Sequence, residues 1–75
     1  MDINQARTFL EIAHGGSFIA AAERLHITQT AVSARIRTLE ELLGRRLFVR
    51  NKSGAKLTSA GERLVRHATT IVQVW

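Results

Sequence analysis

SFIAAAERLHITQTAVSARIRTLEELLG, residues 17–44 of the 75-residue chain, contains two short helical patterns joined by a tight link. Ser17 and Thr28 each stand directly before one pattern, where they can cap a helix. Because residues 25–28 leave room only for a turn, the stretch predicts a helix-turn-helix, whose second helix usually enters a DNA major groove. Apolar residues recur at helical spacing in both patterns, at Phe18, Ala21, Ala22 and Leu25 and then at Val32, Ile36, Leu39 and Leu43.

The size and composition of the chain predict one small domain held together by its core alone. The sequence has 75 residues and no cysteine, which excludes disulfides and thiolate zinc sites and fits a reducing cytoplasm. No signal-peptide pattern and no apolar run of membrane-spanning length is present in it, so we expect no membrane partner.

The net charge of +5 is unevenly distributed along the chain. Residues 1–34 hold two basic and three acidic groups, a net of −1, whereas residues 35–75 hold nine basic and three acidic groups, a net of +6. A basic half beside a nearly neutral half favours one face that binds a polyanion, although a charge bias alone is equally typical of a solvated surface.

The segments that flank the helix-turn-helix predict another helix before it and a hairpin after it. Asp2 and Gln5 have the spacing of a capping box that opens a helix over residues 3–14. Gly44 is a natural end for the third helix. Strand character at residues 47–49 and 55–57 surrounds the turn-forming residues 51–54, which predicts a small basic wing.

The last segment, residues 58–75, predicts a helix with an apolar seam. It begins at Thr58 or Ser59, and Ser59 is slightly favoured because Glu62 would complete a capping box. Steps of four and three are the seam of a coiled coil, so we expect a homodimer through this helix. We interpret the chain as a fragment that ends inside a longer helix, because the seam still runs at its end. The seam residues are Leu64, Val65, Ala68, Ile71, Val72 and Trp75.

The exposed face of the recognition helix, residues 28–43, carries the candidates for reading bases. With Val32 pointing inward and about 100° per residue, Thr30, Ala34 and Arg37 point outward, and Gln29 and Ser33 lie on one flank. A Gln29 amide suits an adenine edge, a Ser33 hydroxyl suits a base or phosphate, and the methyl groups of Thr30 and Ala34 suit thymine.

A second set of residues provides candidates for the phosphate backbone and the wing, residues 49–56. Cationic side chains and free amides at a helix start bind phosphates, which positions a protein on DNA and makes its affinity salt-dependent. The wing would lie at the adjacent minor groove. The candidates are Thr28, Arg35, Arg37, Arg50, Lys52 and Lys56.

Other function classes have less support in the sequence. His14, His26 and His67 are far apart without metal-ligand spacing, and no catalytic or nucleotide-binding motif is present, so we expect neither an enzyme nor a metal site. A protein-interaction module is the stronger alternative, because of the apolar seam. RNA binding would predict exposed aromatic stacking surfaces, whereas the three phenylalanines occupy predicted core positions.

A set of short segments gives the whole chain a resemblance to one family. These segments include Gly16-Ser17-Phe18, Ala21-Ala22-Glu23-Arg24-Leu25, Thr28-Gln29, Ala31-Val32-Ser33, Leu47-Phe48, Arg50 and Ala60-Gly61-Glu62. Their order and content resemble the N-terminal DNA-binding domain of the LysR-type transcriptional regulators.

The resemblance implies a mainly helical fold with two parts. Residues 1–57 would form a winged helix-turn-helix, and residues 58–75 a linker helix that pairs two subunits antiparallel, in a protein that is often a tetramer. It also implies a cytoplasmic, nucleoid-associated bacterial regulator of double-stranded DNA. No cofactor is expected in this fragment, because the small-molecule effector would bind a C-terminal domain absent from the sequence.

The resemblance further implies DNA contacts by Gln29, Ser33, the residues at positions 30 and 34, and a wing residue at 52–53. Two positions depart from the family pattern. Thr30 stands where proline is frequent, which restores an N–H at the start of the helix. Ala34 stands where arginine is frequent, and Arg35 points about 100° away from it.

Overall fold

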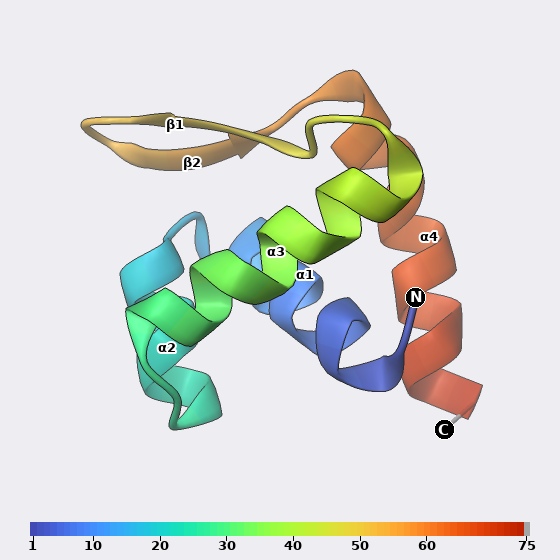
Figure 1. Cartoon of the computed structure of the whole chain (residues 1–75), viewed down its shortest axis with the longest axis horizontal. Coiled ribbons are helices and arrows are strands. Elements are labelled where there is room, and N and C mark those ends of the chain that lie inside the picture. The colour runs from blue at the N-terminus through green and yellow to red at the C-terminus, as the bar shows by residue number, and fades with distance from the viewer. Residues whose placement is uncertain (75) are drawn as a thin grey trace.

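The computed structural model describes residues 1–74, which form a mainly helical winged helix-turn-helix, as predicted (Figure 1). Helices α1, α2 and α3 form one unit, the hairpin of β1 and β2 extends along one side of it, and α4 lies at the other end. The elements follow the order α1 (Ile3–Gly15), α2 (Phe18–Leu25), α3 (Gln29–Leu43), β1 (Phe48–Asn51), β2 (Gly54–Leu57) and α4 (Ser59–Val74).

Side-chain caps set the starts of the first three helices where the sequence predicted them. The Asp2 carboxylate accepts the Gln5 N–H at 2.7 Å, and the Gln5 side chain accepts the Asp2 N–H in return. The Ser17 hydroxyl accepts the Ala20 N–H at 3.1 Å, and the Thr28 hydroxyl caps α3 in the same manner. The Thr28 cap therefore fixes where the turn between α2 and α3 ends.

Helix α4 is capped by Thr58, so the slight preference for Ser59 as its cap was wrong. The Thr58 hydroxyl accepts the Gly61 N–H at 3.1 Å and donates to the Arg46 carbonyl at 2.6 Å. The Thr58 N–H also donates to the Leu47 carbonyl at 3.0 Å. Thr58 is the cap because these bonds attach it to the segment that leads into β1, a long-range contact that a local capping pattern does not contain.

The core lies where α1, α2 and α3 meet the base of the hairpin. Phe9, Val32 and Leu39 have no exposed surface. The ring of Phe48 lies 5.4 Å from the ring of Phe9 and 5.7 Å from the ring of Phe18, measured between centroids. These aromatic contacts attach the hairpin to α1 and α2, which an isolated two-stranded sheet requires for stability.

The hairpin pairs Phe48 with Leu57 and Asn51 with Gly54 in an antiparallel register. The Asn51 side chain accepts the Ser53 N–H at 2.9 Å and stabilises the turn. The Ala55 N–H donates to the Gly16 carbonyl at 2.9 Å, so the hairpin is also bonded to the turn between α1 and α2. At Gly54, φ is 133° and an added Cβ would lie 2.2 Å from the Gly16 oxygen, so only glycine allows this approach.

Helix α4 packs along α1, and this contact changes the expectation for the seam. Ala68 has no exposed surface within the monomer and therefore cannot contact a partner subunit. The prediction that Ala68 is a dimerisation residue is wrong, because α1 already covers the centre of the stripe. The predicted seam residue Trp75 lies outside the described residues. Leu64, Val65, Ile71 and Val72 are half-buried against the core.

Candidate nucleic-acid interface

Helix α3 is oriented as its apolar periodicity predicted. Val32 and Ile36 are 0% and 3% exposed, whereas Gln29, Thr30 and Ala34 are exposed to solvent. This orientation follows from the Thr28 cap at one end and the apolar contacts of the helix along its length. The predicted base-reading side of the helix is therefore accessible.

A surface hollow brings the base-reading candidates together with two cations. It lies between α3 and the hairpin, and we call it the reading hollow. Gln29 and Ser33 provide hydrogen-bonding groups to it, whereas Thr30 and Ala34 provide small side chains suited to close approach of a base edge. Its lining residues are Gln29, Thr30, Ser33, Ala34, Arg37 and Arg50.

Arg35 lies on a different side of α3 from these residues. Its guanidinium donates to the Thr8 hydroxyl of α1 at 3.2 Å, and Thr8 is itself fully buried. Three residues beyond Val32 on the helix, Arg35 occupies the flank opposite to Gln29. Arg35 thus joins α3 to α1 and lines no part of the reading hollow, and its predicted backbone contact stays a prediction.

Arg50 is held close to α2 and α3 and away from the tip of the hairpin. Its guanidinium carbon lies 4.0 Å from the centroid of the Phe18 ring, a cation–π contact. Lys52 is in the turn and Lys56 is on β2, and both are exposed but line no part of the reading hollow. The basic residues of the wing therefore divide into one fixed arginine and two solvated lysines.

Glu40 helps to hold the candidate interface together, a role that the sequence did not predict. Its carboxylate accepts the Leu47 N–H at 2.7 Å, and the Arg46 guanidinium lies 3.8 Å away. This pair of contacts joins the end of α3 to the start of the hairpin. The available signal in the sequence was a charged residue close to the inward-facing Ile36 and Leu39. The contact between Glu40 and Leu47 could not be predicted, because no helical or strand periodicity relates the two positions.

Over residues 1–74, no group of three or more histidine or acidic side chains is arranged to hold a metal ion. No helix within that range combines the length and apolarity needed to cross a membrane.

The family model described as bacterial regulatory helix-turn-helix protein, lysR family, matches residues 3–62. The chain belongs to the lysR family. The regulator HdfR of Yersinia enterocolitica is 48% identical over all 75 residues, and HdfR of Salmonella newport is 47% identical over the same length. These relatives are named HTH-type transcriptional regulators, a class that is generally not enzymatic.

Solved structures of lysR-family domains are similar to the whole fold. The DNA-binding domain of CbnR in complex with DNA aligns with a TM-score of 0.94 at 34% identity, over 99% of this chain and 85% of that one. The DNA-binding domain of BenM with catB site 1 DNA aligns with a TM-score of 0.91 at 32% identity, over 97% and 82%. The chain spans 26% and 27% of the two HdfR sequences and corresponds to the DNA-binding domain of a lysR-family regulator.

Proposed function

We propose that this chain binds specific sequences in double-stranded DNA, with α3 in the major groove and the wing at the adjacent minor groove. The observation that carries the proposal is the reading hollow, in which Gln29, Thr30, Ser33 and Ala34 lie beside Arg37 and Arg50. Groups that can distinguish bases are thus exposed next to groups that bind phosphates. Sequence-specific DNA binding uses both kinds of contact, the first for specificity and the second for position.

We assign the base contacts to Gln29, Ser33, Thr30 and Ala34. Gln29 is the principal one, because its amide can donate to and accept from an adenine edge. The two small side chains at 30 and 34 contribute contact with thymine methyl groups. With alanine at position 34, no long cation competes for the base step that this position faces, so we expect methyl recognition there.

We assign the backbone contacts to exposed groups around the reading hollow and on the wing. Thr28 contributes its amide at the start of α3, and Arg37 contributes a cation on the exposed face of the same helix. Arg50 borders the hollow, and the two lysines extend the positive surface along the wing. The set is Thr28, Arg37, Arg50, Lys52 and Lys56.

The dimer that we propose uses one flank of α4. Helical geometry places Leu64, Ile71 and Val74 on one side of the buried Ala68. Val74 is 81% exposed, and Leu64 lines a hollow with Leu43, which is 41% exposed. A second copy of the chain that covers this flank would remove apolar surface from water. A dimer would also present two recognition helices to two half-sites.

The wider assembly extends the proposal to the whole regulator. We propose a cytoplasmic, nucleoid-associated protein in which residues 1–57 bind DNA and residues 58–75 link two subunits. A separate effector-binding domain would receive the small molecule, so the DNA-binding residues need no cofactor. Pairs of dimers would form a tetramer on DNA.

The substitution Gln29→Ala tests the base-reading role. We expect a loss of about 1–3 kcal/mol in binding to the specific duplex, because a bidentate base contact has this magnitude. Binding to random duplex should change little. The measurement is fluorescence anisotropy on both duplexes at one salt concentration, with the specific duplex obtained by selection from a random pool.

Thr38→Ala is the matched control, because Thr38 is an exposed residue of α3 on the flank away from the reading hollow. It should leave both affinities unchanged. Equal losses on specific and random duplex for Gln29→Ala would contradict base reading. Failure of the selection to enrich any motif would contradict sequence-specific binding altogether.

A further inference from the structure

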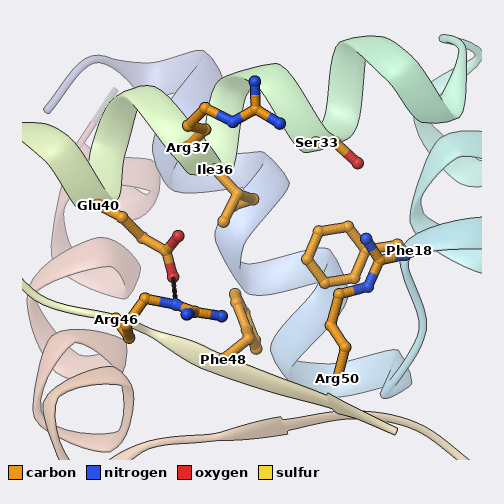
Figure 2. Close-up of a pocket in the computed structure, with 8 residues that line it drawn as sticks. All are labelled: Phe18, Ser33, Ile36, Arg37, Glu40, Arg46, Phe48 and Arg50. Atoms are coloured by element: carbon orange, nitrogen blue, oxygen red, sulfur yellow. Dashed lines mark ion pairs between the residues drawn. The ribbon is translucent and has the colours of Figure 1, made fainter. Parts of the chain in front are cut away.

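A second hollow adjoins the reading hollow and is lined by three arginines, so we call it the arginine hollow (Figure 2). Arg37 reaches it from α3, Arg46 from the segment before β1, and Arg50 from β1. Glu40 is its acidic member. Three guanidinium groups and one carboxylate give the hollow a net charge of +2.

The carboxylate of Glu40 is already engaged. It accepts the Leu47 N–H at 2.7 Å and faces the Arg46 guanidinium at 3.8 Å. Its side chain is only 19% exposed, whereas that of Arg46 is 77% exposed. The negative charge is therefore compensated on the protein side, and Arg37 and Arg50 remain as exposed donors toward solvent.

The floor of the arginine hollow is apolar and rigid. Phe18, Ile36 and Phe48 form it, and each of them is at most 6% exposed. Figure 2 shows Ser33 and Arg37 on the α3 side, with Arg46 and Arg50 on the opposite side and Phe48 between them. The cations thus stand around a solvent-facing space, and a low-dielectric floor strengthens their attraction for an anion.

Arg50 is preorganised for such an anion. Its guanidinium lies over the Phe18 ring at 4.0 Å, which restricts the long side chain before any ligand arrives. A planar guanidinium in a fixed position matches the oxygens of a phosphate with two parallel hydrogen bonds. The entropy cost of ordering this side chain on binding is reduced accordingly.

We propose that the arginine hollow binds a single phosphate group of the DNA backbone, held by Arg37 and Arg50 with the Ser33 hydroxyl as a further donor. This assignment rests on the proposed function and adds a discrete site to it. Phe18 is a positioning residue that holds Arg50. One phosphate bound from α3 and β1 together sets the position of both elements on the duplex.

Three variants distinguish the effect of the Arg50 charge from the effect of its position. The affinity of each variant for the specific duplex is measured over a range of salt concentrations. Arg50→Gln should lower affinity and reduce the salt slope by about 0.9, the value for one phosphate contact. Arg50→Lys keeps the charge and loses the planar fork, so affinity should fall about tenfold with the slope unchanged. Phe18→Leu should behave as Arg50→Lys does, because the arginine remains but is no longer held.

Phe18 is also a core residue, so the Phe18→Leu variant is compared with wild type by thermal unfolding before the binding measurement. The double variant Phe18→Leu with Arg50→Gln tests the positioning role of Phe18 even if the stability of the protein falls. If Phe18 acts through Arg50, the double variant binds DNA as weakly as Arg50→Gln alone. Independent, multiplying losses would overturn the positioning role of Phe18.

Duplexes with one neutral methylphosphonate at successive positions locate the phosphate itself. We expect one position in each half-site at which wild type loses more affinity than Arg50→Gln does, because the variant keeps only the contacts of Arg37 and Ser33 with that phosphate. A scan in which Arg50→Gln and wild type respond alike at every position would overturn the proposal. A flat scan together with binding of inorganic phosphate to the DNA-free protein would overturn it in favour of a free-anion site.

The outcome for Gln29→Ala separates this proposal from the proposed function. If that variant loses specific binding while the scan is flat, only the arginine hollow is wrongly assigned. If the scan is positive while Gln29→Ala affects specific and random duplex equally, the phosphate site stands and the base-reading assignment fails.

Discussion

Gly61 shows how strongly one residue can determine the contact between two elements. It lies in the first turn of α4, directly against the segment that leads into β1. A Cβ added there would lie 2.3 Å from the Leu47 carbonyl oxygen and 2.9 Å from the Leu57 Cδ2 atom. The close approach that lets Thr58 bond to both Arg46 and Leu47 therefore requires glycine.

We expect Gly61→Ala to lower the free energy of unfolding by about 1–3 kcal/mol, because overpacking against backbone forces a shift of either α4 or the hairpin. Chemical denaturation followed by circular dichroism measures this change. Gly15→Ala is the matched control, since an added Cβ there meets only the flexible end of Arg24 at 3.3 Å. Comparable stability of the two variants would contradict the close approach.

Local residue patterns were predictable from the sequence, and long-range contacts were not. The caps at Asp2, Ser17 and Thr28 depend on residues three positions away and were predicted correctly. The contacts of Arg35 and Thr58 were not predicted, because their partners lie 27 and 12 residues away in the chain. A guanidinium on a helix surface has the same local signature whether it faces solvent or a neighbouring helix.

At the scale of elements, the hairpin is the element whose proposed function depends most on the contacts that attach it to the helices. Its strands were predicted within two residues of their observed bounds, since β-branched and turn-forming residues mark them. The bond from Ala55 to Gly16 and the stack of Arg50 on Phe18 were not predictable, because both connect the hairpin to α1 and α2. Lys52 and Lys56 are the exposed lysines of the wing.

Lys52→Gln and Lys56→Gln should each lower DNA affinity on all sequences and reduce the salt slope by up to about 0.9. Neither lysine lines the reading hollow, so the ratio of specific to random binding should stay constant. The measurement is affinity over a range of salt concentrations. Arg66→Gln removes an exposed charge from α4 and is the control. A slope equal to that of wild type would remove the substituted lysine from the backbone contacts.

At the scale of the whole molecule, α4 has one role that the structure shows, in the monomer core, and one that we propose, in the dimer. The centre of its apolar stripe, at Ala68, belongs to the monomer core. The periodicity of the stripe was visible in the sequence, but the burial of its centre in the monomer core was not. An apolar stripe of this width can pack in a monomer core or in a dimer interface. Only the contact with α1 shows that its centre belongs to the core.

Val74→Asp should weaken the proposed dimer without disturbing the monomer, because Val74 is 81% exposed. Equilibrium sedimentation measures the association constant, and we expect about a tenfold loss or more from a charge at an apolar interface. Gln73→Asp places the same charge at an exposed position on the side of α4 opposite to Ile71 and should change little. A wild-type chain that stays monomeric at high concentration would contradict the dimer.

The backbone bond between the hairpin and the turn after α1 has a consequence for how binding sites can diverge. Because Gly54 leaves no space at the Gly16 carbonyl, the hairpin cannot swing as a hinged arm. In the proposed complex, the separation between the two grooves that one subunit touches is thereby a constant of the monomer. For the proposed dimer we therefore expect that the spacing between half-sites varies with the subunit arrangement, whereas the footprint within each half-site keeps one length.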